Sequence, residues 1–288
     1  LWLNEGFTSY VENRIMEEVF GRNRAVMEQA LDAQGLNYEI AELPPGDTQL
    51  YIDLAGRDPD DAFSGVPYTK GQLFLIYLEE KFGRQRFDEF ILNYFDSHAF
   101  ESLGTANFVK YLNKELINKY PGIVSDGEVN EWIYEQGLPT FVPKPTSDAF
   151  INIDTQINQL LSDEITLAQL PTANWTVHQW LHFINNLPLN ISLARMASLD
   201  QAFNLTQSQN AEIAHAWYLL SLRVGYDKIY TAMSDYLVSI GRRTLIVPLY
   251  KVLAESEQGK AWAKKVYLKA RPGYHPLAQG TVDSILKD

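Results

Sequence analysis

The sequence contains no cysteine among its 288 residues. Disulfide frameworks, thiolate zinc fingers and thiol nucleophiles are therefore excluded, and any metal would have to be bound by His, Asp or Glu side chains or by water. Long apolar runs are also missing. The longest, such as residues 74–78, are far shorter than the roughly 20 residues that a helix needs to span a bilayer. No signal peptide is visible either.

Positive charge is scarce: 24 Lys and Arg residues stand against 36 Asp and Glu, for a formal net charge of −12. Binding to a nucleic-acid backbone requires clustered Lys and Arg side chains, and an anionic membrane surface attracts the same groups. We therefore expect neither nucleic acid nor membrane as a partner.

Helical periodicity dominates what is present, and 46% of the residues are hydrophobic, which is enough for ordinary buried cores. Residues 47–65 are the exception, because closely spaced Gly, Asp-Pro and Ser-Gly signals predict a long loop. A loop of that length inside a compact domain is often functional. The predicted helices of the first half are 7–20, 23–42, 68–82, 85–98, 105–119 and 127–136.

A domain boundary is predicted at residues 138–146, where three prolines in nine residues cannot propagate a helix. The apolar stripes beyond it, such as the one formed by Ile213, Trp217 and Leu220, predict successive short helices stacked as an α-solenoid. The predicted helices are 148–162, 173–187, 191–204, 208–224, 228–241, 243–256 and 258–271. The predicted organisation is a mainly α chain with a first domain at 1–142, a proline-rich linker at 143–147 and a helical domain at 148–288.

The first candidate motif is WLNEGFT, residues 2–8, where a carboxylate opens an amphipathic helix beside a glycine. Glu5, Thr8 and Glu12 are spaced i, i+3 and i+7 and therefore share one helix face. Taken alone, two carboxylates on one face are usually solvated surface groups.

The second candidate motif, DDAFSGVPYTKG, occupies residues 60–71. Tyr68 follows Pro67 directly, and proline fixes the backbone approach to the first turn of a helix. Without further context, the default interpretation of this tyrosine is a packed aromatic side chain.

Two further patterns carry weaker signals. Arg242 follows Gly241 near a predicted helix end, where an arginine commonly pairs with solvent or with the helix dipole. His178 and His182 have the i, i+4 spacing of two metal ligands on one helix face, but Gln179 stands where a general base would be needed. We therefore interpret this histidine pair as a surface or helix-edge feature.

The segments WLNEGF and VPYTKG together resemble the gluzincin zinc aminopeptidases, and most closely those similar to leukotriene A4 hydrolase. In that family a HEXXH helix precedes the W-L-N-E-G glutamate by eighteen intervening residues. The resemblance implies that Glu5 ligates one zinc ion. It places the two histidine ligands and the general-base glutamate before Leu1, which is not a methionine, so we expect a preceding segment to carry them.

The resemblance also implies roles for residues of the second motif and its surroundings. The Tyr68 hydroxyl would donate a hydrogen bond to the oxyanion of the tetrahedral intermediate, which a neutral phenol can do without changing its charge. Asp60 matches an aspartate that places water in epoxide hydrolysis. Phe63 stands where the family enzyme has a second tyrosine, and with Leu1 it would line the side-chain pocket. Glu12 would orient a ligand from the second coordination shell.

In the C-terminal half, Arg242 matches an arginine that receives the carboxylate end of the substrate, and a guanidinium suits a carboxylate in bidentate fashion. Thr244 replaces the family's lysine, so we expect weaker carboxylate anchoring. The implied fold is mainly α: the C-terminal helical part of a thermolysin-like catalytic domain, followed by an α-α superhelical domain of the armadillo or HEAT type. The implied substrates are peptides with a free N-terminus, and the expected protein is a cytoplasmic monomer.

Two alternatives stay open. The acidic, solenoid-like half could be a helical protein-interaction module that accompanies a degenerate catalytic remnant. The chain could instead come from a bifunctional epoxide hydrolase and aminopeptidase, although Phe63 and Thr244 weigh against that activity. The chain by itself is predicted to bind zinc weakly and to be inactive, because one carboxylate is not a tetrahedral zinc site.

Overall fold

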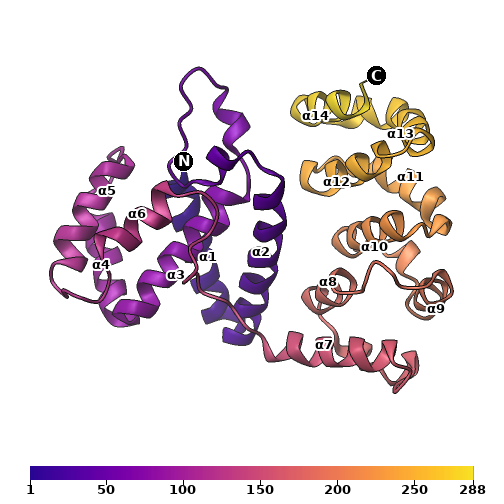
Figure 1. Cartoon of the computed structure of the whole chain (residues 1–288), viewed down its shortest axis with the longest axis horizontal. Coiled ribbons are helices and arrows are strands. Elements are labelled where there is room, and N and C mark those ends of the chain that lie inside the picture. Colours follow the sequence, from indigo (N-terminus) through magenta and orange to yellow (C-terminus); the bar gives the residue numbers. More distant parts are fainter. Residues whose placement is uncertain (288) are drawn as a thin grey trace. The chain divides into compact units, whose positions relative to one another are not determined.

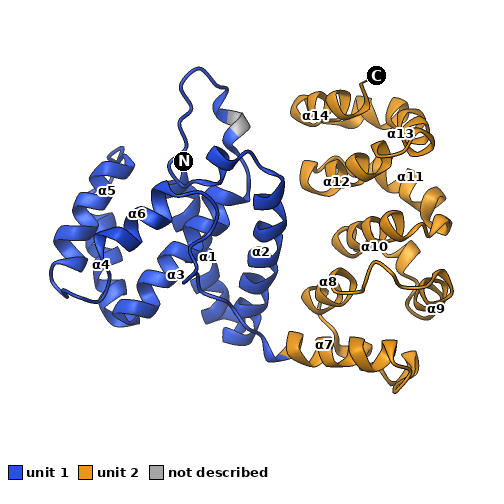
Figure 2. Cartoon of the chain, in the orientation of Figure 1, with its two compact units in different colours: residues 1–148 blue, residues 149–288 orange. Residues whose placement is uncertain are grey.

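A computed structural model describes residues 1–287, apart from the side chains of Asp60 and Asp61. Every regular element among the described residues is helical, which confirms the prediction of a mainly α chain (Figure 1). None of their helices is long and apolar enough to cross a membrane. The chain divides into two compact units, Leu1–Asp148 and Ala149–Asp288 (Figure 2).

Unit 1 consists of six α-helices and the turns between them. Gly21 and Gly83 end α1 and α3 with φ angles of 87° and 83°, a conformation that disfavours other residues. The Ser125 side chain caps α6 in a reciprocal capping box with Glu128. The helices are α1 (Trp2–Phe20), α2 (Arg22–Glu42), α3 (Gly71–Phe82), α4 (Arg84–Ser97), α5 (Thr105–Leu112) and α6 (Asp126–Tyr134), and the turns are η1 (Pro45–Thr48), η2 (Pro59–Ala62), η3 (Val66–Lys70) and η4 (Asn113–Ile117).

The core of unit 1 is aromatic and begins at the first helical residue. The Trp2 ring packs edge-on against Phe108, with 5.5 Å between centroids, and tilted against Phe74 at 6.0 Å. Phe74 in turn stacks on Trp132 of α6 at 5.5 Å. These rings are essentially inaccessible to solvent and dominate the apolar area that the unit buries. They therefore fix the start of α1 against α3, α5 and α6.

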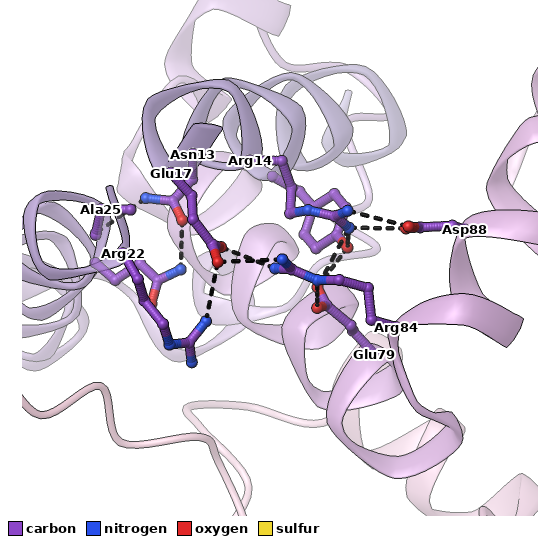
Figure 3. A network of polar contacts seen from close by, with 10 residues as sticks. Asn13, Arg14, Glu17, Arg22, Ala25, Glu79, Arg84 and Asp88 are labelled. Carbon is purple, nitrogen blue, oxygen red and sulfur yellow. Dashed lines mark hydrogen bonds and ion pairs between the residues drawn. The ribbon is translucent and has the colours of Figure 1, made fainter. Parts of the chain in front are cut away.

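Ion pairs hold the middle of α1 to the helices beside it (Figure 3). Both terminal nitrogens of Arg14 donate to Asp88 of α4, at 2.8 and 3.1 Å. Arg84 donates to Glu17 of α1 and to Glu79 of α3, at distances between 2.7 and 3.1 Å. A bidentate guanidinium–carboxylate pair fixes orientation as well as distance. The network consequently sets the register of α1 on α3.

Unit 2 is a stack of helices in two rows, as Figure 1 shows in orange to yellow. In one row α8, α10, α12 and α14 pack in succession, and α11 packs on α13 in the other. Each helix thus buries its apolar face against its neighbours, as in a solenoid. The helices are α7 (Asp148–Leu161), α8 (Val177–Asn185), α9 (Leu193–Phe203), α10 (Ala211–Val224), α11 (Tyr230–Ser239), α12 (Arg243–Ala254), α13 (Glu257–Ala270) and α14 (Pro276–Leu286).

Several helix predictions differ from the structure. The predicted helix 68–82 begins in the π-helical turn η3 and becomes an α-helix only at Gly71. The predicted helix 173–187 starts only at Val177, because the Thr176 side chain caps it through Gln179. The predicted helix 105–119 passes into a π-helical turn after Leu112. The last helix, α14, was not predicted at all. Pro276 occupies its first turn, the one helical position where a missing N–H costs nothing.

Candidate active site

Glu5 lies in the first turn of α1, where its negative charge complements the helix dipole. The residue is half-buried. Asn4 Nδ2 donates to Glu5 Oε1 at 3.2 Å and orients that oxygen. Among the residues that the structure describes, no Lys or Arg side chain pairs with this carboxylate, so its charge is not neutralised by a neighbouring cation.

Tyr68 lies in η3, a π-helical turn that leads directly into α3. Pro67 is in the first positions of the turn, and the Gly71 N–H closes it by donating to Val66 O, five residues earlier. Single π-helical turns are rare and frequently occur at functional sites. The tyrosine ring is half-buried, so its hydroxyl stays within reach of solvent.

Glu5 and Tyr68 meet because α1 and η3 cross at two glycines. A Cβ atom built on Gly6 would come within 2.9 Å of Gly71 Cα, and one built on Gly71 within 2.9 Å of Gly6 Cα. Only glycine allows backbones to approach so closely. Burial raises the pKa of the Tyr68 phenol, and the charge of Glu5 and a hydrogen bond to it raise the pKa further.

This site supplies a single ligand for a divalent cation, the Glu5 carboxylate. A carboxylate that is half-open and lacks a cationic partner suits a zinc ligand. In the described part of the chain, however, no group of three or more His, Asp or Glu side chains could hold a metal ion. A zinc ion at Glu5 therefore needs ligands other than those among the described residues.

The other residues singled out in unit 1 are placed as follows. Leu1 and Phe63 are exposed, at 46% and 47%, and Glu12 is exposed about two helical turns from Glu5 on the same face of α1. The side chain of Asp60 lies outside the described residues. Leu1 meets Glu5 through the backbone, where the Glu5 N–H donates to Leu1 O at 3.1 Å. No side-chain contact among the described residues joins Leu1, Phe63 or Glu12 to the Glu5–Tyr68 pair. Their roles stay predictions.

In unit 2, Arg242 stands at the start of α12 with 70% of its side chain exposed. Its Nη1 atom lies 3.5 Å from Glu212 Oε1, a long and solvent-screened pair. Thr244, in the first turn of the same helix, is exposed and adds no positive charge. The guanidinium is thus open to a carboxylate from solution.

The histidine pair of α8 has a packing role in the structure. His182 Nε2 lies 2.7 Å from Asp154 Oδ1 of α7, and the imidazole stacks on Phe150 with 4.0 Å between ring centroids. Both His178 and His182 are half-buried. His182 thus joins α8 to α7, in line with the interpretation of this pair as a helix-edge feature.

Lys70 is the residue of this region that the sequence interpretation overlooked. It is completely buried, and its Nζ atom donates to the backbone carbonyls of Thr48 and Glu135, at 2.9 and 3.0 Å. Burial lowers the pKa of Lys70 to about 8. The sequence does contain a sign of this burial. Lys70 stands three and four residues before Leu73 and Phe74, and this helical spacing places it on the same buried face.

Two family profiles match the chain along most of its length. Residues 1–132 match the peptidase family M1 domain. Residues 175–286 match the C-terminal domain of leukotriene A4 hydrolase. Glu5 and Tyr68 fall inside the first match and Arg242 inside the second.

Curated proteins and solved structures agree with these profiles. Leucine aminopeptidase 2 of Pyricularia oryzae is 32% identical over 305 residues, which cover 99% of this chain and 48% of that protein. The Neurospora crassa protein of the same name is 31% identical, with coverages of 99% and 44%. Yeast leukotriene A4 hydrolase, solved in complex with bestatin, has a TM-score of 0.85 at 26% identity, with coverages of 100% and 50%. The chain spans about half the length of the curated relatives it matches.

Proposed function

The chain belongs to peptidase family M1, in the group that carries the leukotriene A4 hydrolase C-terminal domain, and from this premise we propose that it is part of a zinc aminopeptidase. The proposed reaction is hydrolysis of the first peptide bond of substrates with a free N-terminus. Leucine aminopeptidase is the activity named for its curated relatives.

The meeting of Glu5 and Tyr68 is the single observation that carries this proposal. Their side chains come from separate elements and contact each other across the Gly6–Gly71 crossing. A carboxylate without a cationic partner, next to a phenol that can donate, combines one metal ligand with one oxyanion donor. A solvated surface carboxylate would not require such a crossing.

In the proposed reaction, Glu5 contributes one oxygen ligand and Asn4 holds its carboxylate in place. When bound, a zinc ion would polarise the scissile carbonyl and lower the pKa of water towards about 7. The Tyr68 hydroxyl would donate to the carbonyl oxygen as that oxygen gains negative charge. A neutral donor aimed at developing charge accelerates the reaction without any change in its own protonation.

Substrate contacts follow from the exposed residues already described. Leu1 and Phe63 would add apolar surface for the first side chain of a peptide. Arg242 would bind a substrate carboxylate through its exposed guanidinium, more weakly than in enzymes with a second positive charge, because position 244 is a threonine. The epoxide hydrolase and interaction-module alternatives have no contact among the described residues in their favour. The monomeric state and cytoplasmic location stay predictions.

The direct test joins this chain to the N-terminal half that its relatives possess and measures zinc content together with hydrolysis of leucine nitroanilide. Glu5→Gln should lose zinc and nearly all turnover, since an amide is a poor ligand for zinc. Bestatin, which the yeast relative holds in its structure, should inhibit the parent enzyme.

Glu18→Gln is the matched control, because Glu18 is an exposed glutamate of the same helix. It should retain both zinc and turnover. Full zinc content and an unchanged rate in Glu5→Gln would exclude Glu5 as a ligand and remove the basis of the proposal.

A further inference from the structure

The buried ammonium group of Lys70 connects three segments of unit 1. Lys70 itself ends the π-helical turn η3, and its two carbonyl acceptors belong to Thr48, at the end of η1, and to Glu135, at the end of α6. Thr48 also accepts a hydrogen bond at its Oγ1 atom from the Gly137 N–H, at 2.8 Å. The turn that carries Tyr68 is thus tied at its C-terminal end.

The partner of this connection is the carboxyl end of α6. The last carbonyls of a helix lack partners within the helix and are costly to leave unpaired when buried. Here a side chain or backbone group from residues 49–70 satisfies each of three successive carbonyls: Tyr51 N donates to Ile133 O at 3.0 Å, Gln49 Nε2 to Tyr134 O at 2.6 Å, and Lys70 Nζ to Glu135 O at 3.0 Å. A cation at a helix C-terminus also complements the negative end of its dipole. The charge of Lys70 therefore has a specific structural counterpart.

The opposite side of the same turn is fixed by the close approach of Gly71 to Gly6. Within four residues of chain, Lys70 must point into the interior, Gly71 must face α1, and Tyr68 must reach Glu5. Successive residues of an α-helix are about 100° apart around the axis. Closing the turn as an ordinary α-helix would change the rotation of Tyr68 relative to the other two.

We propose that Lys70 is a positioning residue for Tyr68: its bonds to the Thr48 and Glu135 carbonyls hold η3 in the conformation that places the phenol beside Glu5. The inference rests on the proposed function for its catalytic consequence, but the placement of Tyr68 can be measured without zinc or turnover. Lys70 touches neither Glu5 nor the exposed surface of the site, so it acts only through the turn.

The first test observes the position of Tyr68 directly. 3-Fluorotyrosine incorporated at position 68 of the 288-residue chain should give a ¹⁹F signal that depends on the neighbouring Glu5. In Lys70→Met, which keeps the length of the side chain but cannot donate, this signal should move towards that of a solvent-exposed fluorotyrosine. Lys110→Met replaces an exposed lysine of α5 and should leave the signal in place.

The second test separates positioning from general structural damage in the enzyme restored with the N-terminal half of its relatives. Misplacing a reacting group by about 1 Å costs on the order of 10²-fold in rate, so Lys70→Met should lower kcat by about that factor while KM and zinc content stay close to the parent values. In a Tyr68→Phe background, Lys70→Met should have almost no further effect, because the hydroxyl it positions is gone.

Gly71→Ala is the second variant and keeps the buried charge. Its added Cβ would meet the backbone of Gly6, so η3 must shift away from α1 and the ¹⁹F signal should move as in Lys70→Met. If circular dichroism shows that Lys70→Met does not fold, Lys70→Gln takes its place, because its shorter, uncharged amide cannot hold both the Thr48 and the Glu135 carbonyl and should move the ¹⁹F signal as well.

An unmoved ¹⁹F signal in the folded variants would overturn the inference, and so would an equal loss of kcat from Lys70→Met with and without the Tyr68 hydroxyl. Failure of the proposed function would look different. The restored parent enzyme would then lack zinc-dependent turnover while the ¹⁹F signal still responded to Lys70.

Discussion

The two units use buried polar groups differently. In unit 1, charged side chains bridge separate elements. Arg14 and Arg84 join α1 to α3 and α4 (Figure 3). Lys70 joins η3 to the end of α6. In unit 2, the buried polar atoms are mostly hydroxyl and indole groups that bond to one another or to a nearby carbonyl. Examples are Trp217 with Thr206 and Tyr274 with Leu237 O.

The different use of buried polar groups indicates different structural roles for the two units. Bonds between charged groups fix orientation, and unit 1 concentrates them around the helices that present Glu5 and Tyr68. Unit 2 pairs most of its buried polar atoms within an apolar stack, which limits their cost to stability, although Ser221 Oγ is buried without a partner in the described part of the unit. We therefore expect changes in unit 1 to affect the chemistry and changes at buried positions of unit 2 to affect mainly the stability.

The largest loss of stability should come from the centre of unit 2. Trp217 is fully buried on α10, so Trp217→Ala should lower the free energy of unfolding by about 3–5 kcal/mol. Hydrogen exchange followed by mass spectrometry should show faster exchange in α10 and α12 and unchanged exchange in α1 and η3. Trp262→Ala, at a half-exposed position of α13, should cost clearly less. Equal acceleration in α1 would contradict the separation of the two units.

A smaller loss is expected from the ion-pair network of unit 1. Arg14→Met removes two bonds to Asp88 and one to the Tyr10 hydroxyl at 2.7 Å, and it should cost about 1–2 kcal/mol in urea unfolding. High salt should reduce the difference in unfolding free energy between the parent and Arg14→Met, because salt screens the ion pairs. Arg22→Met tests the comparison, since that side chain is 70% exposed and pairs with Glu17 only at 3.5 Å. A cost in Arg22→Met equal to that in Arg14→Met would show that the network adds nothing beyond surface charge.

The hydrogen-bonded hydroxyls of Tyr250 and Tyr274 in unit 2 should each contribute about 1 kcal/mol to the free energy of unfolding. Tyr250 Oη lies 3.2 Å from Tyr274 Oη, which itself donates to Leu237 O at 2.6 Å. Tyr250→Phe removes one bond at the end of this chain, whereas Tyr274→Phe also leaves a carbonyl without its donor. In thermal unfolding, Tyr274→Phe should therefore have a lower melting temperature than Tyr250→Phe. The reverse order would mean that the Leu237 carbonyl finds another partner.

The smallest effect should be a pH dependence in unit 2. His215 Nδ1 donates to Leu245 O at 2.8 Å, and burial lowers the pKa of the imidazole below 6.5. The unfolded chain then binds a proton at a higher pH than the native state, so stability is lost as the pH falls below about 6.5. His215→Gln should flatten this part of the curve of unfolding free energy against pH. An unchanged slope would assign the acid sensitivity to other groups.

Most of the fold could be predicted from the sequence, because the apolar residues repeat at helical spacing and Gly or Pro marks most helix ends. The π-helical turns could not, since a turn closed five residues back depends on tertiary contacts such as the one between Gly6 and Gly71. The helix at residues 276–286 was not predicted, although Pro276 stands in its first turn, where proline is favoured.

The site could be predicted in part. The motifs around Glu5 and Tyr68 identified both residues, but only the structure places their side chains together. Lys70 belongs to the same motif as Tyr68, but no role was predicted for it. The identity of a lysine does not indicate that its charge is buried against carbonyls of two segments remote in sequence. The roles of Leu1, Phe63, Asp60, Glu12 and Arg242 are still predictions.

The most direct measurement of the central claim compares two phenols that each bond to a glutamate. Tyr68 lies beside Glu5, and the Tyr77 hydroxyl donates to Glu128 at 2.7 Å, in the interior of the same unit. When the chain is joined to the N-terminal half of its relatives, Tyr68→Phe should lower kcat on the order of 10²–10³-fold with zinc retained, and Tyr77→Phe should leave kcat within a small factor of the parent. Equal rates in the two variants would contradict the assignment of Tyr68 as the oxyanion donor.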